Sequence, residues 1–148
     1  MEIMTRDFGK VDIDEDKIIE FPEGLPGFKQ EKEFVLLPLE KDSLFVIMQS
    51  VNNPDLAFIT IEPKSIIKDY EFEISEKTET LLEISGIEDI ILLNIVNIKE
   101  KLKDMTINLA APLVININAN LGKQVILDDT KYPVKYKLDK TESKEMMS

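Results

Sequence analysis

The chain of 148 residues contains no histidine, no cysteine and no tryptophan. Histidine and cysteine supply the commonest general base, the thiolate nucleophile and most ligands of zinc, iron and copper, so their absence excludes those chemistries. An enzyme built from this sequence would have to use paired carboxylates, a lysine nucleophile, or Mg²⁺ or Ca²⁺ held by oxygen ligands. Without cysteine there is no disulfide framework, and we expect neither a cofactor nor a metal site.

Positive charge is also scarce. The chain has 18 lysines and arginines against 29 aspartates and glutamates, a net charge of −11, and its single arginine is Arg6. Residues 1–74 carry 17 acidic and eight basic side chains, so the first half is the more acidic. Binding to a phosphate backbone requires clustered lysine and arginine, and we therefore expect no direct contact with nucleic acid. The acidic surface either attracts a basic protein partner or serves solubility alone.

Long apolar runs are missing as well. No run approaches the ~20 residues that cross a bilayer, and the strongest candidate, Ile90–Leu93, is interrupted by Asn94. The first residues, Met1–Asp7, lack the basic-then-apolar pattern of a secretory signal. We therefore expect a cytoplasmic protein without membrane contact. Its length favours one domain, placed at residues 1–138, followed by a mobile tail at 139–148.

Most of the hydrophobic pattern has a period of two. Short alternating or continuously apolar segments, separated by turn residues, predict strands at 17–21, 33–39, 43–50, 56–61, 89–98, 105–109, 113–118 and 123–127. Residues 70–74 also alternate, and form either a strand or the lead into a helix. That helix begins after Ser75 as N-cap and ends at Gly86 as the residue after the C-cap. The pattern predicts a mainly β, single-domain antiparallel β-barrel, or barrel-like sandwich, with one short helix.

The segment Ile19–Phe28 contains two prolines and two glycines around three large apolar residues. Proline fixes φ and glycine permits positive φ, so this backbone path is strongly constrained. Phe21, Leu25 and Phe28 are then either core residues beneath a corner or anchors for a partner. Glu20 and Glu23 flank the loop, and we interpret them as charges facing solvent at its rim.

Two polar segments are candidate contacts. Asp12, Asp14 and Asp16 belong to the densest acidic run, which lacks the glycine and distal glutamate of a calcium-binding EF-hand loop. We interpret the run as a solvated turn, or as a contact for a basic partner. Asn116 and Asn118 alternate with isoleucine and predict one polar strand face, which is either an exposed edge or a recognition surface. Gly122 is expected to form the turn before the final strand.

Five landmarks occur in order along nearly the whole chain, from about residue 2 to residue 137. They are Phe21-Pro22-Glu23-Gly24-Leu25-Pro26-Gly27-Phe28, Leu36-Leu37-Pro38-Leu39, Phe45-Val46-Ile47-Met48-Gln49-Ser50, Asn108-Leu109-Ala110-Ala111-Pro112-Leu113-Val114-Ile115-Asn116 and Gly122-Lys123-Gln124-Val125-Ile126-Leu127. Together these landmarks resemble the FliW family of bacterial flagellar assembly factors.

The resemblance implies a cytoplasmic β-barrel without catalytic activity. Members of this family bind newly made flagellin, and they bind the RNA-binding translational repressor CsrA without occupying its RNA site. Once flagellin is exported, the freed factor captures CsrA and flagellin translation resumes. We predict that the partner-binding residues are Glu20, Phe21, Glu23, Leu25, Phe28, Asp12, Asp14, Asp16, Asn116 and Asn118. Two alternatives stay open, a carboxylate-based hydrolase in a β-barrel and an adaptor or secretion chaperone for another substrate.

Overall fold

The computed structural model describes residues 1–40, 43–99, 101, 104–128 and 131–137. The whole predicted tail, residues 139–148, and residue 138 of the predicted domain lie outside the described residues. Within the described ranges, no helix is long and apolar enough to cross a membrane.

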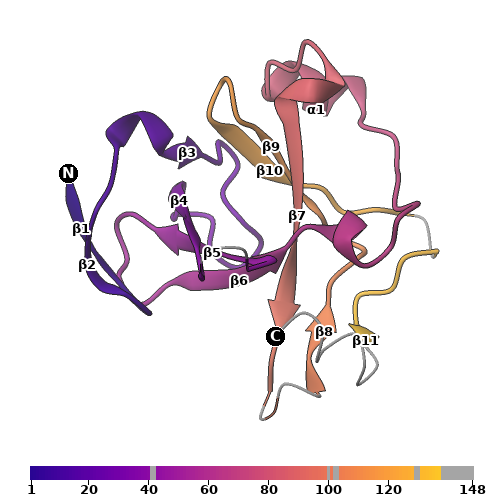
Figure 1. Ribbon diagram of the computed structural model, residues 1–148. Coiled ribbons are helices and arrows are strands. Elements are labelled where there is room, and N and C mark those ends of the chain that lie inside the picture. The colour runs from indigo at the N-terminus through magenta and orange to yellow at the C-terminus, as the bar shows by residue number, and fades with distance from the viewer. Residues whose placement is uncertain (41–42, 100, 102–103, 129–130, 138–148) are drawn as a thin grey trace.

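Seven strands close into a barrel (Figure 1). They are β3 (Ile19–Glu20), β4 (Glu33–Pro38), β5 (Phe45–Ser50), β6 (Ala57–Ile61), β7 (Ile90–Asn97), β9 (Leu113–Asn116) and β10 (Leu121–Gln124). Consecutive neighbours from β3 to β7 pair antiparallel, as do β7 with β9 and β9 with β10. The ring closes where β10 meets β3 in a parallel pairing of Leu121 with Glu20. The prediction of a mainly β barrel with one short helix is confirmed.

Two additional strands extend the sheet beyond the barrel. β8 (Thr106–Ile107) pairs with the end of β7, and β11 (Tyr136–Lys137) pairs with β8 (Figure 1). A separate hairpin, β1 (Glu2–Thr5) and β2 (Gly9–Asp12), lies at the N-terminal side of the barrel. The strand pattern of the sequence did not predict this hairpin, because its residues are mostly polar or exposed. Its inward-facing Ile3 packs with Ile13 and Val35.

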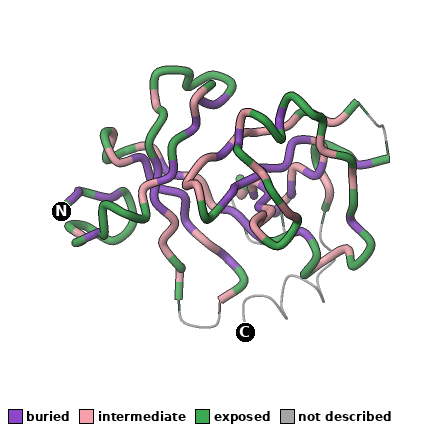
Figure 2. Tube along the Cα trace, turned by 90° about the horizontal axis from the view of Figure 1, so that it is seen from above, coloured by how far each residue is buried: buried purple, intermediate pink, exposed green. Residues whose placement is uncertain are grey.

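Long β7 separates two apolar cores. One, the barrel core, contains Ile19, Phe21, Leu25, Phe34, Met48, Leu93, Leu113 and Ile115. The other, the outer core, contains Phe45, Ile61, Tyr70, Val96, Met105, Ile107, Leu109 and Tyr132. Ile91 and Ile95 of β7 pack against the barrel core and Leu92 against the outer core, so both faces of the strand are covered. This explains why Ile90–Leu93 is continuously apolar rather than alternating. In Figure 2 the buried stretches gather where the strands pack, and the outlying loops are exposed.

The helix α1 (Glu76–Leu81) begins as predicted, because the Ser75 hydroxyl accepts a hydrogen bond from the Thr78 amide at 3.2 Å. The predicted end is wrong. Glu83, not Gly86, takes the left-handed conformation after the C-cap, with φ of 54°. The amides of Glu83 and Ile84 donate to the carbonyls of Thr80 and Glu79, which is the hydrogen-bond pattern of a Schellman motif. Residues 70–74 are not a strand, and lead into the helix.

The prediction for Gly122 is also wrong. Gly122 lies within β10, and residues 117–120 form the turn, in which Asn120 has φ of 57°. A Cβ at Gly122 would lie 2.7 Å from Cζ of Phe21, so glycine is needed here because an aromatic ring packs directly on the strand. The last predicted strand therefore begins two residues earlier, at Leu121.

Candidate partner-binding surface

The corner loop after β3 divides its three apolar side chains between core and surface. Phe21 and Leu25 are buried in the barrel core, whereas Phe28 is 42% exposed. Gly24 turns the chain at φ of 67°, and a Cβ there would lie 2.6 Å from the carbonyl oxygen of Lys29. Phe21 and Leu25 therefore cannot serve as contact residues, and Phe28 alone of the three reaches solvent.

Phe28 does not stand free on the surface. Its ring meets that of Phe58 edge to face, with centroids 5.7 Å apart, and its amide donates to the Leu25 carbonyl at 2.8 Å. The hydrogen bond restrains the backbone at Phe28 and the aromatic contact restrains its ring, which lowers the entropy that a partner would have to remove. An ordered, half-exposed aromatic ring is suited to contact a protein partner.

The flanking charges of the loop differ in their surroundings. Glu23 forms an ion pair with Lys123 of β10, with 3.3 Å between Nζ and Oε1. This pair joins the loop to a strand about 100 residues later in the chain. Glu20 is exposed on β3 beside the closure of the barrel. Both carboxylates face solvent, as the sequence predicted for rim charges.

The acidic run forms an exposed turn. Asp14 caps a short 3-10 helix (Glu15–Lys17), and its Oδ1 accepts from the Asp16 amide at 2.9 Å. Asp12 accepts from the N-terminal ammonium group at 3.1 Å. No group of three acidic, histidine or cysteine side chains within the described ranges could hold a metal ion. The run is a solvated turn, and its contact with a basic partner stays a prediction.

Asn116 and Asn118 do not share one strand face, because β9 ends at Asn116 and Asn118 lies in the following turn. Asn116 is buried, and its amide donates to the carbonyls of Leu82 at 2.8 Å and Glu83 at 3.1 Å. The Asn116 Oδ1 accepts a hydrogen bond from the backbone amide of Asn118, so this side chain contacts both the helix end and the turn. Asn116 is therefore structural and not a partner contact. Asn118 lies in the turn, exposed, and its amide donates to the Asp89 carboxylate.

Three surface hollows were not indicated by any sequence pattern. The Arg6 hollow, of about 430 Å³, lies where β6 and β7 diverge, and Phe58, the partner of Phe28, lines it. Arg6 donates to the Ala57 carbonyl at 2.7 Å and pairs with Asp7 at 3.0 Å, so the single arginine ties the N-terminal hairpin to β6.

The other two hollows lie on either side of the segment 70–74. The Ile87 groove, of about 240 Å³, is lined by Phe72, Ile74, Ile87, Ile90 and Leu92, together with polar residues at its rim. The neighbouring Tyr132 hollow, of about 580 Å³, shares Glu71 and Phe72 with the groove. The groove is formed by three separate segments, 62–64, 70–74 and 87–92, which explains why no local sequence pattern reveals it.

A buried polar network supports the segment 70–74 from below. The Tyr70 hydroxyl donates to the Leu109 carbonyl at 2.7 Å, and the Asn94 amide donates to the Asn108 carbonyl at 2.8 Å. Burial raises the pKa of Tyr70 above its ordinary value, and the hydrogen bond from Asn94 opposes this shift. The amide of Glu71 donates to the Tyr132 hydroxyl at 3.0 Å, so the segment is fixed at two adjacent residues.

The hydrolase alternative gains no support from these hollows. It requires two carboxyl groups in a cleft, at least one of them shielded from water. The carboxylates that line the hollows are all exposed (Glu62, Glu71, Glu73 and Asp128), and no aspartate or glutamate belongs to the buried residues of the described chain.

The comparisons with known proteins agree with the fold. The FliW protein family model matches residues 2–138. A flagellar assembly factor FliW of Geobacillus sp. (strain WCH70) is 50% identical over 138 residues, which cover 93% of this chain and 95% of that protein. The flagellar assembly factor FliW of Bacillus subtilis (strain 168) is 43% identical over 136 residues, covering 92% and 95%.

A solved structure gives the same result. The crystal structure of the flagellar assembly factor FliW superposes with a TM-score of 0.88 at 43% sequence identity, covering 94% of this chain and 97% of that one. The resemblance carried by the five sequence landmarks is thereby confirmed. The chain belongs to the FliW family.

Proposed function

We propose that this chain is a non-enzymatic flagellar assembly factor of the cytoplasm that binds flagellin and, when free of it, binds and antagonises the RNA-binding repressor CsrA. The similarity to proteins named flagellar assembly factor FliW, at 50% identity over nearly the whole length of both chains, carries the proposal. Capture of CsrA relieves the repression of flagellin translation.

The chemistry of the chain supports a role in binding. It has no histidine or cysteine, and the described residues include no buried carboxylate that could act as a shielded acid or base. A net charge of −11 favours encounter with a basic RNA-binding protein. Exchange between two partners needs only two coupled binding equilibria and no chemical step.

Size-exclusion chromatography with purified partners tests the proposal. The chain should co-elute with flagellin and, separately, with CsrA, and flagellin added in excess should release CsrA from the complex. A CsrA-bound RNA should be released when the free chain is added. Failure to co-elute with both partners refutes the proposal, and co-elution with flagellin alone restricts the chain to a secretion chaperone.

A further inference from the structure

The Ile87 groove is lined largely by apolar side chains, one of which is strongly exposed. Ile87 is 84% exposed, the largest fraction among the exposed large hydrophobic residues of the described chain. A single exposed isoleucine is ordinary on a protein surface. Ile87, however, borders a groove whose other apolar lining includes Phe72, Ile74, Ile90 and Leu92. A contiguous apolar hollow of this kind marks a contact site for another molecule.

The walls of the groove are held rigidly. Ile90 and Leu92 belong to β7 and are in register with Asn116 and Val114 of β9. The facing segment is fixed by the Tyr70 hydroxyl bond to the Leu109 carbonyl. The short turn that carries Ile87 is closed by the Asp89 amide, which donates to the Gly86 carbonyl at 3.1 Å. A groove formed in advance binds an apolar segment with little loss of its own conformational freedom.

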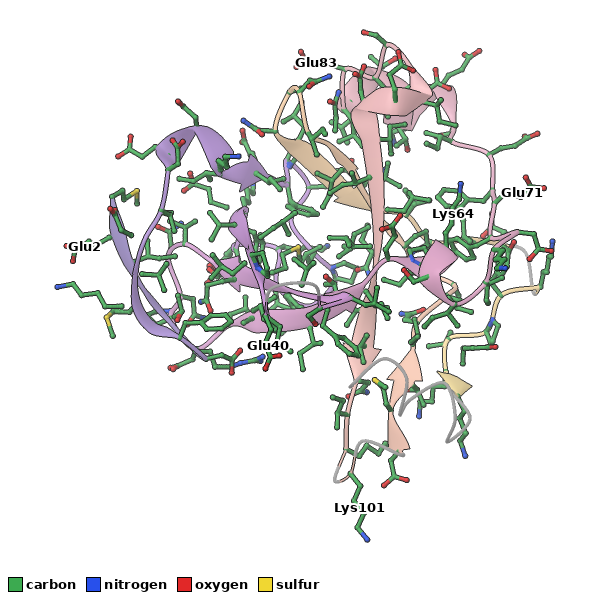
Figure 3. All side chains as sticks on the ribbon, in the orientation of Figure 1. Glu2, Glu40, Lys64, Glu71, Glu83 and Lys101 are labelled. Carbon is green, nitrogen blue, oxygen red and sulfur yellow. The ribbon has the colours of Figure 1, made fainter. Side chains whose placement is uncertain are left out.

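The charges around the groove are mainly negative. Glu62 and Glu71 line it with one lysine, Lys64, and the adjoining Tyr132 hollow adds Glu73 and Asp128 with Lys131. These four carboxylates belong to exposed residues. Figure 3 shows Glu71 and Lys64 on the side of the molecule opposite Glu2, well away from the N-terminal hairpin. Because carboxylates outnumber ammonium groups two to one, the rim attracts positively charged flanking residues.

We propose that the Ile87 groove receives a short apolar segment flanked by lysine or arginine, contributed by an RNA-binding protein partner. Such a partner needs a lysine- and arginine-rich surface to hold phosphate groups, and the acidic rim is complementary to it. Flagellin and a second copy of this chain are the competing occupants. The identity of the partner rests on the proposed function, whereas the chemistry of the segment rests on the groove itself.

Two variants separate the apolar and the electrostatic contributions. Ile87→Asp places a charge in the groove, and since Ile87 is 84% exposed it should leave thermal unfolding unchanged. It should weaken CsrA binding, measured by calorimetry, at least about tenfold, while flagellin affinity stays within about twofold. Glu71→Lys/Glu73→Lys should weaken CsrA binding by a similar factor and remove most of its dependence on salt.

Matched controls use exposed residues outside the groove. Ile126→Asp makes the same substitution at an isoleucine that is 62% exposed and does not line the groove. Asp55→Lys/Glu40→Lys changes the net charge by the same amount at two exposed residues that line neither hollow and lie outside the acidic run (Glu40 is labelled in Figure 3). Both controls should alter CsrA affinity by no more than about twofold.

A peptide assay tests the groove independently of any natural partner. A synthetic peptide with an apolar centre and lysine flanks should shift the methyl NMR signals of Ile74, Ile87 and Ile90 in the full chain. The same centre with glutamate flanks should not. If the wild-type chain binds neither flagellin nor CsrA, the proposed function fails, and this assay still decides the chemistry of the groove.

Several outcomes overturn the inference. CsrA binding by both groove variants at wild-type affinity excludes this surface as its site. Loss of flagellin binding with CsrA binding retained assigns the groove to the other partner. A wild-type dimer that Ile87→Asp converts to a monomer in sedimentation analysis shows that a second copy covers the groove. Absence of any methyl shift with the lysine-flanked peptide refutes the predicted segment.

Discussion

The contact between Gly122 and Phe21 predicts a specific steric coupling between two ends of the chain. A Cβ added at Gly122 would lie 2.7 Å from Cζ of Phe21, and 2.9 Å and 3.0 Å from its two Cε atoms. The ring would have to retreat by roughly 0.7 Å to restore ordinary contact. It has little space to do so, because Phe21 is fully buried and packs edge to face on Phe34 at 5.5 Å.

Gly122→Ala should therefore destabilise the fold by about 2 kcal/mol, within the usual range for overpacking a core. The backbone of Gly122 lies outside the left-handed region, so strain in φ adds nothing to this cost. The free energy of unfolding, measured by urea titration followed by circular dichroism, gives the value. Gly86→Ala is the matched control, because the three atoms nearest to the added Cβ all belong to the flexible Glu88 carboxylate, and it should change stability by less than about 0.5 kcal/mol.

A double-mutant cycle tests the cause. Phe21→Leu alone should cost about 1–2 kcal/mol through lost packing. In the Phe21→Leu background the smaller side chain leaves room, so Gly122→Ala should cost about 1 kcal/mol less than in the wild type. Strictly additive effects of the two substitutions would show that the alanine is accommodated without touching the ring, and would refute this account of Gly122.

Three further predictions concern the helix end and the buried network. Glu83→Gly should raise the free energy of unfolding by about 0.5–1 kcal/mol in urea titrations, because glycine adopts the positive φ of 54° without the steric cost of a Cβ; an unchanged or lower value contradicts this. Asn116→Ala should destabilise the fold by about 2 kcal/mol in thermal unfolding, because the buried side-chain amide makes four hydrogen bonds, whereas the exposed Asn118→Ala should cost less than about 0.5 kcal/mol. Burial raises the pKa of Tyr70 in the folded state above the unfolded value of 10.0, so its contribution to stability is complete below that pH and is lost as pH rises through the folded-state pKa. Tyr70→Phe should flatten this alkaline fall in a pH series of unfolding curves and cost about 1 kcal/mol at neutral pH by leaving the Leu109 carbonyl without its partner; an unchanged alkaline slope contradicts the assignment.

The parts of the fold that depend on neighbours in the sequence could be predicted. Short apolar runs between turn residues indicated the strands β4, β5 and β6, because each run is a property of the strand's own residues. Ser75 was identified as an N-cap because the cap bond to Thr78 spans three residues. Phe21 and Leu25 could be assigned to the core as one of two alternatives, since the prolines and glycines around them constrain the loop.

The parts that depend on distant segments could not. Glycine is required at position 122 because the Phe21 ring, about 100 residues earlier in the chain, packs against it. The residues next to Gly122 in the sequence do not indicate this contact. The helix ends before Gly86 because Asn116, from β9, donates to the carbonyls of Leu82 and Glu83. The spacing of Asn116 indicated a polar strand face, but its side chain instead bonds the end of the helix. This tertiary contact overrides the local pattern.

The candidate surface was predictable only in part. Phe28 could be named from the loop, but the groove around Ile87 combines residues from three segments of the chain, at 62–64, 70–74 and 87–92. The sole indication in the sequence is an isoleucine between Gly86 and Glu88, in a polar turn where apolar residues have no obvious local role. Which surface meets flagellin, and which meets CsrA, stays a prediction.

The seam between β3 and β10 has a consequence for biosynthesis. One pairing, Leu121 with Glu20, completes the ring, and its two halves are separated by most of the chain. A nascent polypeptide that has left the ribosome through β9 thus still has two unsatisfied strand edges, which are prone to pair with other chains. The barrel can therefore close only after the last quarter of the chain has begun to emerge. Truncation before residue 121 should yield insoluble protein rather than a smaller functional domain.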